Sequence, residues 1–411
     1  MNHTEQLKLF GPTPIFRKYL PDVVPVEGQD VPTFEWDIPH TIPQLGYLVH
    51  SHYRYYGKFP SVVAGQILEQ YPLQSDNHYV LDNFCGSGTT LVEAKLRGFR
   101  SFGLDISWLS VLASNVKVRH LDISDVTRTH QSLVGDFAAA RDSVEVPQHR
   151  ILDKWFDPVA AKDLFAIQHL LLDLAPSRTR DFLLIAFIAI VRRVSLAFDG
   201  EVRPHINKAK KQRDVLPAFS KKVRDMTRDH RAYQSVSSSS TEAECVLGDN
   251  RELPERFDDG GCQLVISHPP YLNSFNYAPV FGLEFFWGQP FESQFVDGRT
   301  SLQKTELKAH PAVESIVDRY MAHLNTCYEA TYRIQPKGGV LAVVIGDCTR
   351  NKRLIPVVDM AIEQVKMLGY TLEQANFRTT HYGLGKYAYS HRADYHGEEA
   401  IKRDAILVFR K

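Results

Sequence analysis

The chain has 411 residues, of which 44% are hydrophobic and 23% are charged, the proportions of an ordinary globular protein. Its 48 Lys and Arg residues balance its 48 Asp and Glu residues, so the formal net charge is zero. This balance excludes a general electrostatic attraction of the whole chain to nucleic acid, and any such binding must come from a local patch.

The five cysteines are scattered and none forms a Cys-x-x-Cys pair, which argues for a reducing compartment and against a structural zinc site. The longest apolar run, residues 182–191, is about half the length of a membrane span, and the first residues do not resemble a signal peptide. We therefore expect a cytoplasmic protein that binds neither a metal nor a membrane.

Residues 1–45 are rich in proline and lack periodicity, which predicts an extended or partly disordered arm. An aromatic and basic loop, residues 52–61, follows and leads into a helical pattern through Ile67 and Leu68. Lys58 and Phe59 stand near the end of this loop, directly before Pro60. Such a loop could cover a ligand, or it could simply pack its aromatic side chains at the start of the helix.

Residues 79–94 predict a strand, a glycine turn and a helix. The apolar strand ends at Asp82, and Gly86 and Gly88 are separated by one residue in the turn. Because glycine has no Cβ, a ligand can lie directly against this backbone, where the first amides of the helix also point. The turn lacks the Lys of a phosphate-binding loop, and Leu91 stands where an NAD-binding turn has its third glycine. A glycine turn without any ligand is the alternative.

Two further acids follow predicted strands. Asp105 ends the second strand, 17 residues after Gly88. In a doubly wound sheet this position lies beside the first turn, where a carboxylate can accept hydrogen bonds from a ribose diol, although a lone Asp after a strand is commonly a turn residue. Asp249 ends a short strand over residues 244–249.

Residues 123–243 predict a mainly helical insertion, which is basic in its second half. Between Glu201 and Tyr233, ten Lys or Arg residues face four acids, an excess of six positive charges. This excess predicts a surface that contacts DNA phosphates, although a solvated helix face with mixed charges would look similar. The candidate DNA contacts are Lys208, Lys210, Lys211, Arg213, Lys221 and Lys222.

A buried-type strand over residues 262–267 leads into His268-Pro269-Pro270-Tyr271. An exocyclic amine on an aromatic ring is a weak nucleophile, because its lone pair is delocalised into the ring. Acceptors that bind the amine hydrogens can direct that lone pair at an electrophile. The stiff proline pair can present the carbonyl of Pro269 as one acceptor, and the preceding side chain can supply another. The Tyr271 ring offers a flat surface for a base extruded from the duplex.

The Asp-x-Phe-x-Gly-Ser-Gly-Thr-Thr stretch at residues 82–90 and the Pro-Pro-Tyr loop together resemble the signature of DNA amino-methyltransferases that use S-adenosylmethionine (AdoMet). The resemblance implies a Rossmann-like class I methyltransferase fold of the α/β class, with a seven-stranded, mostly parallel sheet and a helical insertion. We expect this domain to comprise residues 46–122 and 244–411. The implied partners are AdoMet, double-stranded DNA and a cognate restriction or phage-defence nuclease.

The resemblance also implies roles for particular residues. Contacts with AdoMet are expected from Lys58, Phe59, Asp82, Phe84, Cys85, Gly86, Gly88, Thr89, Thr90, Asp105 and Asp249. Catalytic contacts are expected from Ser267, His268, Pro269, Pro270 and Tyr271.

The chain departs from the family at His268, where Asp, Asn or Ser is usual. A neutral imidazole can accept a hydrogen bond but an imidazolium cannot, so methyl transfer is expected to fall as the pH drops through the pKa of this histidine. A flat rate from pH 5.5 to 8 would contradict that expectation. The histidine leaves the target open between cytosine N4 and adenine N6, and the text of residues 270–277 favours cytosine N4.

Two other functions fit the same sequence motifs. Pro-Pro-Tyr loops also serve RNA and protein-amide methyltransferases, which uptake of labelled methyl groups by tRNA or protein would reveal. A catalytically silent protein that binds nucleic acid would bind AdoMet without transferring its methyl group.

Overall fold

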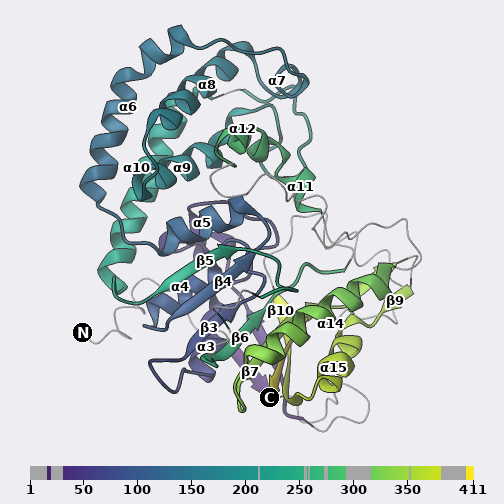
Figure 1. The fold of residues 1–411 in the computed structure, drawn as a ribbon. Coiled ribbons are helices and arrows are strands. Elements are labelled where there is room, and N and C mark those ends of the chain that lie inside the picture. Colours follow the sequence, from purple (N-terminus) through teal and green to yellow (C-terminus); the bar gives the residue numbers. More distant parts are fainter. Residues whose placement is uncertain are drawn as a thin grey trace.

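A nine-stranded mixed sheet forms the lower half of the molecule in Figure 1. The computed structural model describes residues 16–19, 31–211, 213–253, 257, 260–272, 276–292, 316–350, 353–380 and 404–411. From edge to edge the sheet contains β1 (Phe16–Tyr19), β2 (Thr33–Ile38), β10 (Thr371–Thr380), β11 (Asp404–Arg410), β7 (Val340–Gly346), β6 (Cys262–Ser267), β3 (Tyr79–Asp82), β4 (Ser101–Asp105) and β5 (Ala243–Leu247). The predicted α/β class is present, but the predicted count of seven strands is wrong.

The sheet is mostly parallel. Strands β5, β4, β3, β6 and β7 are parallel neighbours, whereas β11 is antiparallel to both β7 and β10. The two additional strands come from the proline-rich segment: β2 pairs in parallel with β10, and β1 pairs antiparallel with β2. Trp36 and Ile38 of β2 are fully buried, so this strand belongs to the core. Pro32 and Pro39 immediately flank it, which hides its pattern in the sequence.

Helices cover both faces of the sheet. Every residue of β3, β6 and β7 is buried, as expected for central strands between two helical layers. On one face, α3 (Ser61–Gln70) packs on Val80 and Ile266. On the other, α14 (Ile316–Ile334) and α15 (Val357–Met367) pack on Leu81 and Val265. Adjacent residues of one strand thus face opposite layers, as the two-residue period of a strand requires.

Smaller elements complete this half of the molecule. The helices α4 (Thr89–Leu96) and α5 (Trp108–Val118) follow β3 and β4. A short helix α2 (Ile42–Leu45) and a 3₁₀ turn η1 (Leu48–Ser51) precede α3, and β8 (Cys348–Arg350) forms a hairpin with β9 (Arg353–Ile355). No helix within the described ranges is long and apolar enough to cross a membrane.

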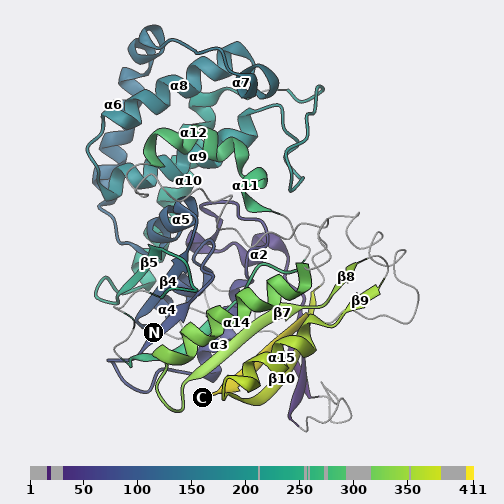
Figure 2. The same ribbon diagram turned by 45° about the vertical axis from the view of Figure 1, so that its right-hand side comes forward.

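A helical unit stands above the sheet in both views (Figures 1 and 2). It contains α6 (Ile123–Ser143), α7 (Arg150–Trp155), α8 (Pro158–Asp173), α9 (Arg178–Val194) and α10 (Val215–Val236). The central helix α9 is buried on nearly all sides, as its apolar sequence predicts.

The helical unit also takes up a later part of the chain. The helices α11 (Tyr277–Val280) and α12 (Gly282–Glu292) follow the Pro-Pro-Tyr loop, and Trp287 of α12 is fully buried in the same core as Phe187 of α9. The Gln168 side chain donates to the Trp287 carbonyl at 2.7 Å. The aromatic run around Trp287 therefore packs α12 against the insertion, and the helical unit is larger than residues 123–243.

Candidate functional site

The predicted glycine turn joins β3 to α4 and depends on both of its glycines. Gly86 has φ +52° and Gly88 has φ +75°, in the left-handed region that favours glycine. A Cβ on Gly88 would lie 2.8 Å from the Cβ of Ser114, and one on Gly86 would lie 3.1 Å from the ring of Tyr55. The side-chain faces of these glycines therefore contact protein side chains, and a ligand has to approach the turn from its partly exposed side, at Phe84 and Gly86.

Asp105, at the end of β4, lies beside this turn. Its carboxylate accepts from the backbone N–H of Gly86 at 2.8 Å and from that of Ser107 at 2.8 Å. Burial raises the pKa of Asp105 to about 6, although both amide hydrogen bonds act in the opposite direction. Each oxygen keeps lone pairs beyond its amide bond, and the side chain is partly exposed, so the carboxylate can accept further hydrogen bonds from a ligand.

Asp82 forms the inner side of the same site. Its carboxylate accepts from the backbone N–H of Phe84 at 3.1 Å. Burial, together with the nearby charge of Asp105, raises the pKa of Asp82 to about 7. Thr90, in the first turn of α4, lies close enough to this carboxylate to oppose the shift. The Asp82 carboxyl group is thus only partly ionised at neutral pH, whereas Asp105 is mostly ionised.

The aromatic segment reaches both predicted halves of the site. The ring of Phe59 stacks on His268, with centroids 5.0 Å apart and 29° between the planes. Tyr55 packs on Gly86 and stacks on Tyr277 of α11 at 5.5 Å. The predicted contact Lys58 donates to the carbonyl of His50 at 2.8 Å, and burial lowers its pKa to about 8.

Tyr55 is a site residue that sequence reasoning missed. It belongs to the aromatic and basic loop that the sequence singled out, but the loop contains three tyrosines between residues 53 and 56, and their spacing does not distinguish them. All three rings pack around Phe281 in the helical core, and Tyr55 also lies against Gly86. Only the fold shows which of the three lies on the glycine turn.

The Pro-Pro-Tyr loop follows β6 at the same edge of the sheet, because β6 pairs in parallel with β3. Pro269 is buried, and the carbonyl of Pro270 accepts from the hydroxyl of Tyr320 in α14 at 2.8 Å. Tyr271 donates its hydroxyl to the Asp404 carboxylate at 2.7 Å, and the Arg378 side chain donates to the same Tyr271 oxygen at 3.2 Å. The loop is therefore held by side chains from α14, β10 and β11.

The imidazole of His268 lies edge-on to the Tyr271 ring, with centroids 5.5 Å apart. Burial lowers the pKa of His268 to about 3, and the positive charge of Arg378 acts in the same direction. The ring therefore stays neutral throughout the pH range from 5.5 to 8. Protonation of this histidine, and the loss of activity expected from it, therefore occur only below pH 5.5. A flat rate between pH 5.5 and 8 is thus consistent with a role for His268.

The remaining predicted residues differ in their surroundings. The Ser267 hydroxyl is fully buried and lies close enough to the Tyr328 hydroxyl to oppose the effect of burial, which raises the pKa of that tyrosine. The Asp249 carboxylate accepts from the Arg251 side chain at 2.9 Å, which lowers its pKa against the effect of burial. Cys85 is buried beneath the turn, with its sulfur 3.8 Å from the Ser114 hydroxyl. Residues 273–275, part of the text that favoured cytosine N4, lie outside the described residues.

The six candidate DNA contacts fall into two groups. Lys210 donates to the carbonyl of Ala197 at 2.7 Å, and Lys222 donates to that of Ser51 at 3.1 Å. Both ammonium groups therefore form hydrogen bonds within the protein. The other four side chains are exposed, although Arg213 lies near Asp199 and Lys221 pairs with Asp225. These four are Lys208, Lys211, Arg213 and Lys221.

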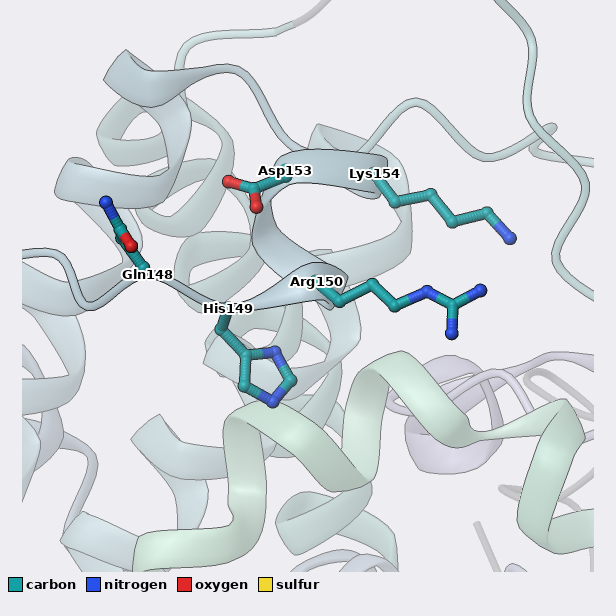
Figure 3. Close-up of a pocket in the computed structure, with 5 residues that line it drawn as sticks. All are labelled: Gln148, His149, Arg150, Asp153 and Lys154. Carbon is teal, nitrogen blue, oxygen red and sulfur yellow. The ribbon is translucent and has the colours of Figure 1, made fainter.

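A shallow hollow of about 440 Å³ lies along α7, at the end of the helical unit remote from the sheet in both views. Figure 3 shows Arg150 and Lys154 extending in the same direction from this helix, while His149 points toward α12. The His149 ring lies 4.8 Å from that of Phe286. This hollow lies on the helical unit and includes none of the residues at the carboxyl edge of the sheet.

The residues around the glycine turn fit AdoMet. The Oδ1 of Asn83 and the Oγ of Ser87 are buried and have no hydrogen-bond partner among the described residues, so both can meet polar groups of a ligand. Asp105 presents a partly exposed carboxylate that can accept from ribose hydroxyls. Phe59 and Tyr55 supply apolar cover on the side toward His268.

Comparison with known proteins identifies sequence relatives. The chain is 24% identical to the Type II methyltransferase M.MvaI of Kocuria varians over 242 residues, which is 53% of each chain. It is 22% identical to the Type II methyltransferase M.BsoBI of Geobacillus stearothermophilus over 266 residues, 57% of this chain and 52% of the relative. A stretch of 80 residues is 35% identical to the Type II methyltransferase M.MjaII of Methanocaldococcus jannaschii, covering 20% of this chain and 15% of the relative.

These relatives confirm the predicted resemblance to methyltransferases. The matched region covers about half the length of M.MvaI and of M.BsoBI. No family model matches the chain. Among solved structures, an rRNA methyltransferase from Streptomyces viridochromogenes aligns over 87% of both chains with a TM-score of 0.33 and 11% identity. That level of similarity establishes neither a fold nor a function.

Proposed function

We propose, from its relationship to Type II methyltransferases, that this chain is an AdoMet-dependent enzyme that methylates an exocyclic amino nitrogen of a base in double-stranded DNA. The observation that carries the proposal is the stack of Phe59 on His268. It joins the segment expected to cover the cofactor to the loop expected to bind the amine. The glycine turn lies at the same edge of the sheet.

The turn supplies the cofactor site. AdoMet, when bound, would supply an electrophilic methyl group on a sulfonium. Asp105 would accept from the ribose hydroxyls, because its two amide hydrogen bonds already orient its carboxylate toward the turn. The partly exposed backbone at Phe84 and Gly86, and the segment with Lys58 and Phe59, would hold the rest of the molecule.

The Pro-Pro-Tyr loop supplies the amine site. A neutral His268 can accept a hydrogen bond from the target amine through one ring nitrogen, and its low pKa keeps that nitrogen available at neutral pH. The carbonyl of Pro269 is the second acceptor, held in place by the rigid proline pair. The Tyr271 ring would stack on the extruded base, and the hydrogen bond to Asp404 fixes its orientation.

The finer assignments rest on the sequence. Cytosine N4 is favoured over adenine N6 by the residues that follow Pro270. Lys208, Lys211, Arg213 and Lys221 are the exposed members of the predicted DNA surface. A cytoplasmic location and a cognate restriction or phage-defence nuclease fit an enzyme of this kind.

The proposal is tested by offering the purified protein AdoMet labelled on its methyl group together with duplex DNA, tRNA and total protein. We expect the label in DNA, and expect His268→Ala to abolish it. Long-read sequencing of DNA from cells that express the wild type or His268→Ala would then give the base and the site. Label in tRNA or protein would assign the chain to another class of amino-methyltransferase, and AdoMet binding without transfer would indicate a silent protein.

A further inference from the structure

A second, deeper hollow lies between the aromatic segment and the helical unit. It has a volume of about 340 Å³, and arginines from three separate parts of the chain line it. Arg54 comes from the aromatic segment, Arg192 and Arg193 from the end of α9, and Arg213 from the residues before α10. Asp199 and Glu284 are its acidic lining residues, so the lining carries four positive charges and two negative ones.

The floor of this hollow is electrically balanced. The Nε of Arg192 lies 3.2 Å from the Glu284 carboxylate, and both side chains are less than one-tenth exposed. Arg192 also donates to the Tyr56 hydroxyl at 2.5 Å and to the Val202 carbonyl at 2.9 Å. The donors of Arg192 are therefore directed into the protein, and this residue shapes the hollow without being free to bind a ligand.

The rim carries an unbalanced positive charge. Its carboxylate, Asp199, already accepts from Lys210 at 2.8 Å and lies 3.9 Å from the Arg213 guanidinium. The Arg54 side chain is held over the Tyr56 ring, 4.9 Å from its centroid, and donates to the Asp199 and Gly200 carbonyls. Among the described residues no carboxylate forms an ion pair with Arg54, although its charge also acts on Glu284.

Arg193 is the most available group on this rim. It is exposed, and no carboxylate pairs with it in the described part of the chain. Burial lowers the pKa of the neighbouring Lys222 to about 8; Asp225 and Asp229 oppose this shift, and the charge of Arg193 adds to it. An anion at this rim would reduce the repulsion between these like charges.

We infer that this hollow binds a backbone phosphate of the substrate DNA through Arg54, Arg193 and Arg213, an inference that rests on the proposed function. A guanidinium presents paired N–H donors in a fixed plane that matches two phosphate oxygens, and three of them around one hollow favour a phosphate. Two tyrosines are among the described lining residues of the hollow. Arg54 and Arg192 both lie over the ring of Tyr56, and Tyr53 is only 3% exposed, so neither ring favours stacking of a base.

The place of the hollow fits that role. Arg54 directly precedes Tyr55, which packs on the glycine turn. Glu284, on the floor of the hollow, belongs to α12, which follows the Pro-Pro-Tyr loop and α11. A phosphate bound here would lie beside elements that form the two halves of the candidate active site, and would position the duplex relative to them.

The test is the salt dependence of DNA binding by the full chain. The affinity for a labelled duplex would be measured by fluorescence anisotropy at salt concentrations from about 50 to about 200 mM. Over this range, affinity that depends on phosphate contacts falls steeply. We expect Arg193→Glu to weaken binding about tenfold and to reduce the slope of log K against log salt by about one. Arg213→Glu should act in the same direction, and Arg193→Lys should keep the slope.

Arg128→Glu is the matched control, because Arg128 is an exposed arginine of α6 that does not line the hollow. Unchanged affinity and slope in both Arg193→Glu and Arg213→Glu, or an equal loss in Arg128→Glu, would overturn the inference. Loss of tRNA binding without loss of DNA binding would overturn it as well. DNA binding through this hollow without methyl transfer would uphold the inference and overturn the proposed function.

Discussion

The ring of Phe59 lies 5.0 Å from the imidazole of His268, and the two planes are inclined by 29°. Phe59 comes from the segment before α3 and β3, and His268 directly follows β6. The stack restricts the imidazole to one orientation and helps to exclude water from it. It therefore links the orientation of the proposed hydrogen-bond acceptor to the segment expected to cover the cofactor.

We expect Phe59→Ala to slow methyl transfer by about tenfold to a hundredfold, because an imidazole without its stacking partner can adopt several orientations. Phe59→Tyr keeps an aromatic ring in the same place and should retain most of the rate. Single-turnover kinetics with saturating AdoMet and DNA would measure both. Equal rates for Phe59→Ala and the wild type would show that the stack has no part in catalysis.

Protonation of His268 should not change the rate of methyl transfer at saturating AdoMet between pH 5.5 and 8. The pKa of His268 is about 3, so its ring gains a proton only well below this range. His268→Asn, which keeps an acceptor, should retain more activity than His268→Ala. An apparent pKa near 6.5 in the wild type that disappears in His268→Asn would contradict an imidazole that stays neutral across this range.

AdoMet binding should weaken as the pH falls through about 6, the pKa of Asp105. Above this pH the carboxylate is ionised and accepts hydrogen bonds strongly, and below it the group is protonated. Asp105→Asn should weaken binding about tenfold at pH 8 and flatten this dependence, since one charged hydrogen bond contributes about 1.5 to 3 kcal/mol. Calorimetric titration at pH 8 and pH 5 would measure it.

Asp181→Asn is the control for this titration. Burial also raises the pKa of Asp181, but this side chain lies on α9 beside Arg119, away from the glycine turn. Its replacement should leave AdoMet affinity unchanged at both pH values. A pH dependence that persists in Asp105→Asn would assign the titrating group to another residue, with Asp82 the nearest candidate.

Asp82→Asn should stabilise the protein without ligand at pH 8. The pKa of Asp82 is raised from 3.8 to about 7, so the folded chain binds the proton more tightly than the unfolded chain does. Stability therefore falls as the pH rises from about 4 to 7, and the substitution removes this loss. We expect a gain of about 1 to 4 kcal/mol at pH 8 and little gain at pH 4, measured by denaturant unfolding. A gain independent of pH would refute the explanation.

Gly88→Ala should lower the free energy of unfolding by about 2 to 4 kcal/mol. The alanine would have to adopt a left-handed φ, and its Cβ would lie too close to Ser114. Gly98 separates the two causes, because it also has φ +75° but a Cβ there would meet nothing within 4 Å. Gly98→Ala should cost only about 1 to 2 kcal/mol. Adding Ser114→Gly to Gly88→Ala should recover part of the loss, and no recovery would mean that contact with Ser114 is not the cause.

The sequence alone was sufficient for features that depend on neighbouring residues. The apolar strand, the glycine turn and the start of α4 lie within one short stretch, and the left-handed φ of Gly86 and Gly88 agrees with their type. Asp105 lies beside the turn because parallel pairing of β3 and β4 brings their ends to one edge. The same rule places the Pro-Pro-Tyr loop there through β6.

Other features required contacts between distant parts of the chain. The tertiary structure decided that β2 extends the sheet, that α12 joins the helical unit and that Lys210 and Lys222 bind carbonyls within the protein. It also selected Tyr55 from three similar tyrosines and lowered the pKa of His268 through burial and Arg378. Local sequence determines backbone conformation, but burial, charge and ring contacts depend on which remote side chains the fold brings together, and no local pattern encodes that.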